Sequence, residues 1–141
     1  MEPAFRFLDL PAELRNKIYY YTLKLCIEDN LTRGSVHEPS LRHTCKQICA
    51  ETEKVYLHAL DTEIDREDYE IDQLNLRRRA FCRKLVHLRE DVRAGIAEAE
   101  DALEEHTRDG EWVLETWHAV DERKKRKKLL NLMLAHAVAF E

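Results

Sequence analysis

Apolar residues recur at helical spacing near the start of the chain, just after Pro11. Leu14 and Ile18 lie four residues apart, and the pattern around them predicts a short amphipathic helix over residues 11–27. Proline suits the first turn of a helix because the N–H that it lacks would be unpaired there. We expect the side chain of Asp9 to cap the free N–H groups of this turn.

A second helix is predicted over residues 41–60. Its apolar positions step by 4, 3, 4, 3 and 4 from Leu41 to Ala59, which makes one apolar stripe. Ser40 directly precedes the stripe and is a suitable N-cap residue. The residues between the two helices, 28–40, combine Asn, Gly, Ser and Pro without an apolar period, so a loop is predicted there.

Residues 61–72 hold seven carboxylates and show no clean apolar period. Like charges at this density repel one another and disfavour burial. This acidic segment is therefore predicted to be a solvated connector, with an extension of the preceding helix as the alternative.

Residues 73–107 are predicted to form a third, long helix. From Phe81 to His106, apolar and small residues alternate in steps of four and three. Gly95 lies on this stripe, and a glycine in a helix interior costs about 1 kcal/mol relative to alanine. Close packing of another helix against Gly95 would offset this cost, and we expect such packing.

The only turn signal in the second half of the chain lies at residues 107–111, where Gly110 fits the end of a helix. A fourth helix is predicted over residues 111–139. Because the connection is short, the third and fourth helices should form an antiparallel hairpin, with residues 130–138 beside residues 81–88. The predicted fold class is all-α: a short helical module followed by a long antiparallel helical hairpin.

Composition narrows the class of protein. A chain of 141 residues has the length of a single domain. Its net charge of −5 argues against general nucleic-acid binding. No apolar run approaches the ~20 residues of a membrane helix, and the N-terminus shows no secretory signal. We expect a protein of the nucleus and/or cytoplasm with reduced cysteines. The expected organisation is a helical module at 1–60, an acidic connector at 61–72, and a hairpin at 73–141 packed on the first module.

Catalytic and metal-binding patterns are sparse. No Ser/His/Asp set, zinc-protease motif or glycine-rich phosphate loop is present in the sequence, so we expect neither an enzyme nor a cofactor. Cys45 and Cys49 lie one helical turn apart, but a structural zinc needs four ligands in fixed geometry. Buried structural cysteines without a metal are therefore expected. Trp112 and Trp117 are expected to pack in the core rather than to anchor a partner.

Two segments carry a family resemblance. Residues 7–23 read FLDLPAELRNKIYYYTL, and residues 39–51 read PSLRHTCKQICAE. The first resembles the opening of the fungal F-box-like proteins, approximately L-x-LP-x-E-[LI]-R-N-x-IY-x-x-x-L. The second resembles the element that follows in those proteins, LL-x-TC-[KR]-QI-x-x-E, with the first Leu of the pair missing. Two motifs in the right order and spacing make the resemblance fairly specific for the family.

The resemblance implies a binding role. F-box domains are small helical modules that bind a Skp-type adaptor of a cullin ubiquitin ligase, while the rest of the chain recruits a substrate. The alternative is that the same apolar face packs on the chain's own hairpin, which itself is able to bind another protein. Carried over position by position, the implied adaptor-facing residues are Leu8, Leu10, Pro11, Leu14, Ile18 and Leu23.

A run of six basic residues at 123–128 suggests an alternative function. It would serve nuclear import or nucleic-acid contact in a nuclear or chromatin-associated helical subunit, which would be oligomeric if the hairpin also paired with other copies. The competing interpretation is a solvated helix segment whose charges pair with carboxylates at 98–105. A second basic cluster, at 77–84, is expected to offset the acidic segment 61–72 within the chain. The residues of the first run are Arg123, Lys124, Lys125, Arg126, Lys127 and Lys128.

Overall fold

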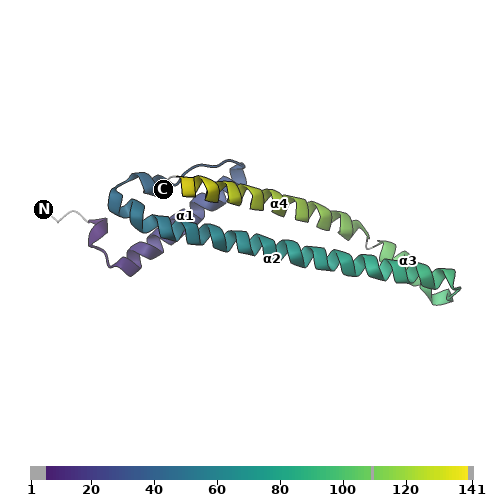
Figure 1. The fold of residues 1–141 in the computed structure, drawn as a ribbon. Helices are drawn as coiled ribbons and strands as arrows, with labels where there is room; N and C mark the ends of the chain where they lie inside the picture. The colour runs from purple at the N-terminus through teal and green to yellow at the C-terminus, as the bar shows by residue number, and fades with distance from the viewer. Residues whose placement is uncertain (1–5, 109, 140–141) are drawn as a thin grey trace. The chain divides into compact units, whose positions relative to one another are not determined.

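The computed structural model describes residues 6–108 and 110–139, and for residues 110–114 it describes only the backbone. Within these ranges the chain is helical and contains no strand, so the predicted all-α class is confirmed (Figure 1). There are two short 3₁₀ helices, η1 (Phe7–Asp9) and η2 (Ser40–His43). The α-helices are α1 (Ala12–Arg33), α2 (Lys46–Arg93), α3 (Ala97–Arg108) and α4 (Gly110–Ala139).

The chain divides into two compact units. The first comprises residues 1–66 together with 126–141, and the second comprises residues 67–125. Helices α2 and α4 therefore each contribute residues to both units. The predicted organisation differs from this division, because the C-terminal part of α4 groups with the N-terminal segment of the chain.

Helix α1 is longer than predicted and starts differently. It continues to Arg33, beyond the predicted end at residue 27, and stops at Gly34, whose φ of 69° suits the left-handed conformation of a helix C-cap. Pro11 is the N-cap residue rather than part of the first turn, and no side chain caps the helix start. The predicted Asp9 cap is therefore wrong.

Helix α2 begins later than predicted. Ser40 lies in η2 rather than at the start of the helix, and α2 begins at Lys46. The thiol of Cys45 takes the capping place, since the backbone N–H of Ile48 donates to its Sγ at 3.5 Å. The predicted Ser40 cap is wrong because Ser40 is the first residue of η2, and α2 begins six residues later.

The acidic segment 61–72 is not a connector, because α2 runs through it without a break. Here the inward positions of α2 are Leu60, just before the segment, and then Ile64, Glu67 and Ile71, spaced at 4, 3 and 4. One of these inward positions is a carboxylate, Glu67, which is buried. The apolar period is hidden in the sequence because a carboxylate, Glu67, occupies one of its positions. The alternative prediction, that the preceding helix extends through this segment, is confirmed.

The predicted continuous helix over residues 73–107 is wrong. Helix α2 ends at Arg93 and α3 begins at Ala97, with Gly95 between them at a φ of 80°. A Cβ built on Gly95 would have nothing within 4 Å, so the expected close helix packing is also absent. Gly95 serves the backbone instead, because glycine adopts positive φ without steric cost.

The chain reverses at Gly95 and not at residues 107–111. Within the second unit, three contacts set α3 and then α4 antiparallel to α2 (Figure 1). They are the stacked rings of Phe81 and His106 at 3.9 Å between centroids, the Arg78 guanidinium 4.1 Å from the Trp117 ring centroid, and the Arg123–Glu67 ion pair at 3.0 Å. Trp117 contacts Arg78 of α2 but is 48% exposed, so the prediction that it packs in the core is wrong. The side chain of Trp112 falls outside the described residues.

The core of the first unit joins three helices. The C-terminal part of α4 packs there against α1 and α2, so the prediction that residues 130–138 lie beside residues 81–88 is wrong. The buried amide of Asn30 donates to the His37 carbonyl at 2.9 Å and to the Met133 sulfur at 3.6 Å. The buried apolar side chains are Tyr19, Leu23 and Ile27 of α1, Tyr56, Ala59 and Leu60 of α2, and Leu130, Met133 and Ala137 of α4.

Candidate partner-binding site on α1

A salt bridge joins α1 to the start of α2. The Arg15 guanidinium donates from Nε to Glu51 Oε2 at 3.1 Å and from Nη2 to Oε1 at 2.9 Å. Its Nη1 donates to the backbone carbonyls of Leu8 and Leu10, at 3.1 Å and 2.6 Å. A two-bonded guanidinium–carboxylate pair is geometrically specific. Arg15 therefore fixes the segment before α1 and the start of α2 at once.

Two further donors complete this cluster. Tyr19 Oη donates to Glu51 Oε2 at 2.7 Å, and Gln47 Nε2 donates to Oε1 at 3.0 Å. Hydrogen bonds from Arg15, Tyr19 and Gln47 lower the pKa of Glu51 to about 2. Burial, followed by the hydrogen bond to Glu51, raises the pKa of Tyr19 to about 12. The cluster is thus most stable with Glu51 ionised and Tyr19 neutral; we call these four residues the Arg15–Glu51 clamp.

The clamp joins the two motifs. Arg15 and Tyr19 belong to the first motif, FLDLPAELRNKIYYYTL, and Gln47 and Glu51 belong to the second, PSLRHTCKQICAE. Sequence analysis placed all four in the motifs but did not predict that they meet. A signal was present in the residue types. The first motif has two hydrogen-bond donors, Arg15 and Tyr19, one helical turn apart, and the second motif has the acceptor Glu51.

The side of α1 away from the core carries a second apolar stripe. Leu14, Ile18, Tyr21 and Leu25 follow one another at steps of 4, 3 and 4, and they are 46%, 42%, 66% and 65% exposed. Positions at this spacing share one face of a helix. We call these four residues the α1 stripe. Helix α1 is therefore apolar on two sides, and the described residues bury only one of them.

The structure divides the predicted adaptor-facing set. Leu8, Pro11, Leu14 and Ile18 are exposed, and Leu10 is half-buried. Leu23 is fully buried in the core of the first unit, so its predicted partner-facing role is wrong. Tyr21 and Leu25 share the helical spacing of Leu14 and Ile18, but they were not among the residues predicted to face an adaptor.

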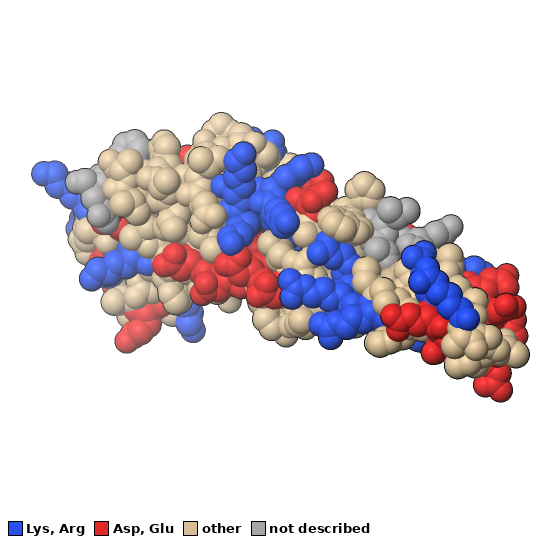
Figure 2. Space-filling view, turned by 45° about the vertical axis from the view of Figure 1, so that its right-hand side comes forward, with Lys and Arg blue, Asp and Glu red and all other residues tan. Residues whose placement is uncertain are grey.

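The basic run at 123–128 is partly neutralised within the chain. Arg123 pairs with buried Glu67 of α2, and Lys125 pairs with Glu122 at 3.1 Å. Pairing inside the chain was one of the two predicted interpretations, but Arg123 uses α2 and not the carboxylates at 98–105. Figure 2 shows Lys and Arg gathered in blocks beside blocks of Asp and Glu on this face of the molecule.

The cysteines differ from the prediction. Cys45 and Cys82 are exposed, while Cys26 and Cys49 are partly buried, so the expectation of buried cysteines fails for two of the four. Burial raises the pKa of the Cys26 thiol. Among the described residues, no three His, Cys, Asp or Glu side chains are grouped to hold a metal ion.

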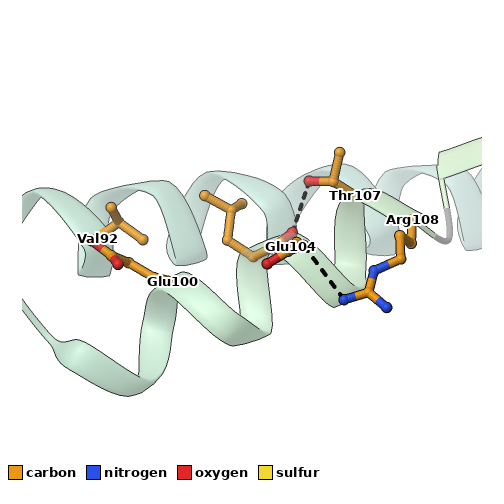
Figure 3. A pocket seen from close by; sticks show the side chains of 6 residues that line it. Val92, Glu100, Glu104, Thr107 and Arg108 are labelled. Carbon is orange, nitrogen blue, oxygen red and sulfur yellow. Dashed lines mark hydrogen bonds and ion pairs between the residues drawn. The ribbon is translucent and has the colours of Figure 1, made fainter.

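A hollow of about 520 Å³ lies at the end of the second unit where α2 and α3 meet (Figure 3). Glu104 pairs with Arg108 at 3.6 Å, and the Thr107 hydroxyl donates to the Leu103 carbonyl at 2.7 Å. Because these polar groups are engaged within α3, we assign no ligand to this hollow.

The chain matches no protein-family model, no curated protein and no solved structure. In the part of the chain that the structure describes, none of the helices combines the length and apolar character needed to cross a membrane. The features of the chain that bear on its function are therefore the α1 stripe, the clamp and the resemblance of the two motifs.

Proposed function

We propose that this chain is a non-catalytic protein-interaction module that binds a Skp-type adaptor of a cullin ubiquitin ligase through α1. The observation that carries the proposal is the exposed α1 stripe; Leu8 and Pro11, in the segment just before the helix, are exposed as well. The resemblance of the two motifs to fungal F-box-like proteins supplies the identity of the partner.

The chemistry of the stripe favours a protein partner. An amphipathic helix that leaves an apolar face in water is typical of helix-in-groove recognition, with anchors at i, i+3 or i+4 and i+7. Leu14, Ile18, Tyr21 and Leu25 have this spacing. Tyrosine is enriched at binding hot spots, so Tyr21 and its neighbour Ile18 are the expected centre of the contact.

The clamp prepares the surface for binding. Arg15 holds the carbonyls of Leu8 and Leu10, which keeps the segment before α1 in place beside the stripe. A surface that is ordered before binding loses less conformational entropy in the complex. The clamp is thus expected to contribute to affinity without touching the partner.

The test is binding of the full chain to a purified Skp-type adaptor, measured by isothermal titration calorimetry. We expect Ile18→Arg to weaken binding at least about 30-fold, since it sets a charge in the centre of an apolar contact. Leu132→Arg is the matched control, because Leu132, like Ile18, is an exposed branched aliphatic residue on a helix of the first unit. Equal affinities for the two variants, or no binding by the parent chain, would overturn the proposal.

The alternative function, nuclear or nucleic-acid contact through residues 123–128, has less support. At least two of the six cations are already paired with carboxylates of the chain, Arg123 with Glu67 and Lys125 with Glu122. A neutralised cation contributes less to phosphate binding. The α1 stripe has no such internal partner among the described residues.

A further inference from the structure

In the second unit, α2 carries two stripes at heptad spacing. The inner stripe follows steps of four and three and is buried or half-buried where α3 and α4 pack on the helix. Its members are Glu67, Ile71, Leu74, Arg78, Phe81, Leu85, Leu88 and Val92. The outer stripe follows steps of 3, 4, 3, 4 and 3, and every member is exposed. Its members are Tyr69, Asp72, Leu76, Arg79, Arg83 and Val86.

The outer stripe is too apolar for a face that meets only water. Tyr69, Leu76 and Val86 are 62%, 55% and 52% exposed. A solvated helix face normally carries polar residues, and a second heptad seam on one helix is typical of packing against a further helix. The outer stripe therefore has the pattern of a helix–helix contact without the second helix.

The charges on the outer stripe are separated along the helix. Asp72 precedes Leu76, whereas Arg79 and Arg83 follow it. Residues 73–89 contain six Lys or Arg and no Asp or Glu. Within the described residues, Arg79 and Arg83 make no ion pair, so the expectation that this cluster offsets segment 61–72 is not met by these two side chains.

We propose that a second copy of this chain packs antiparallel on the outer stripe, with the two-fold axis between residues 77 and 78. Two heptad seams that run in opposite directions bring their alternate positions together in layers. In this register Tyr69 meets Val86 of the second copy, and Asp72 meets Arg83 of the second copy. Leu76 lies beside the aliphatic stem of Arg79 of the second copy. Each contact occurs twice because the interface is symmetric.

The charge order selects this partner and this orientation. A parallel arrangement would set Asp72 against Asp72 and Arg83 against Arg83, and like charges in contact are unfavourable. A polyanion such as DNA would pair with Arg79 and Arg83 but would be repelled by Asp72 and by the carboxylates of residues 61–72. An antiparallel second copy sets Asp72 against Arg83 of the other copy, and it leaves Arg79 beside an apolar residue and not beside a like charge.

The contact is short, so the dimer is weak. From Tyr69 to Val86 the helix advances about 26 Å, at ~1.5 Å per residue. A single helix pair of this length buries less than the roughly 1,200 Å² at which stable complexes begin. We expect self-association in the micromolar range that weakens as salt screens the Asp72–Arg83 pairs.

Sedimentation equilibrium of the full chain tests the inference against the monomer mass of 16.7 kDa. Asp72→Arg and Arg83→Asp should each weaken the dimer about tenfold or more, because each change places like charges in contact at two symmetric positions. The double variant Asp72→Arg/Arg83→Asp should regain the parent affinity, since it only reverses the pair. Glu104→Arg makes the same charge change on an exposed part of α3 and should leave the dimer unchanged.

Two results would overturn the inference. One is a parent chain that stays monomeric up to about 0.5 mM, well above the range expected for a contact of this size. The other is a double variant that fails to regain self-association although its helical circular dichroism equals that of the parent. Adaptor binding uses α1, so its failure or success is a separate result.

Discussion

Replacing Leu130 tests whether the C-terminal part of α4 belongs to the core of the first unit. The Leu130 side chain is fully buried, in the same cluster as Tyr19 and Leu60. Leu130→Ala removes the transfer free energy of the lost methyl and methylene groups and leaves a cavity. Such substitutions cost roughly 2–5 kcal/mol at fully buried sites, and we expect about 3 kcal/mol here. At this chain length, that corresponds to a fall in Tm of about 10 °C.

Leu132→Ala is the matched comparison. Leu132 lies on the same helix and is 52% exposed, whereas Leu130 is 0% exposed. Both substitutions change helix propensity by the same small amount, so the difference between them isolates burial. We expect Leu132→Ala to change the free energy of unfolding by less than about 0.5 kcal/mol. Urea titrations followed by circular dichroism at 222 nm measure both variants.

Similar losses for the two variants would refute the placement of α4. A double-mutant cycle sharpens the result, because the hairpin predicted from sequence would set Leu130 near Leu88 instead. Residues that share a cluster couple by 0.5 kcal/mol or more, roughly, whereas distant residues are additive. Leu130→Ala should therefore couple to Leu60→Ala and be additive with Leu88→Ala; the reverse outcome would support the hairpin predicted from sequence.

Two other predictions follow from the clamp and from the turn at Gly95. The pKa of Glu51 falls from 4.5 to about 2 on folding, so the stabilisation that it contributes is complete above pH 4.5 and is lost as the pH falls toward 2. The gap in urea midpoint between the parent and Glu51→Gln should narrow from pH 6 to pH 2.5, and a constant gap would contradict the clamp. Gly95→Ala should destabilise the fold by about 1–2 kcal/mol, because alanine is strained at a φ of 80°. In a continuous helix the same change would stabilise by about 1 kcal/mol, so the sign of the shift in thermal unfolding separates the two structures.

Local patterns predicted most of the helical content but not its interruptions. The stripe from Phe81 to Val92 was correctly predicted to be helical, because apolar spacing reports the period of a helix directly. The same apolar spacing continues across Gly95. The local sequence does not distinguish a glycine that lets a helix pack closely from a glycine that ends a helix at positive φ. The reversal was therefore placed at Gly110, where turn residues are denser, although the chain turns at Gly95.

The candidate site shows the same limit. The motifs identified Leu14 and Ile18, which are exposed, but also Leu23, which is buried. Both kinds of position are apolar, and the choice between them depends on which face of α1 meets α2 and α4. The sequence assigned no role to Glu51. The structure shows that its carboxylate accepts hydrogen bonds from Arg15 and Tyr19.

By itself, the sequence determined that the chain is all-α, that α1 follows Pro11, and that a helix break lies between the two motifs. These are local properties, set by spacing and by the few glycines and prolines. Only the tertiary structure decided that α2 passes unbroken through the acidic segment, because buried Glu67 is paired with Arg123 from a distant part of the chain. It also decided that Leu130 and Met133 complete the core around α1, which leaves Ile18 and Tyr21 exposed. The physical reason is that burial depends on contacts between distant segments, whereas periodicity reports only that a helix has an apolar face.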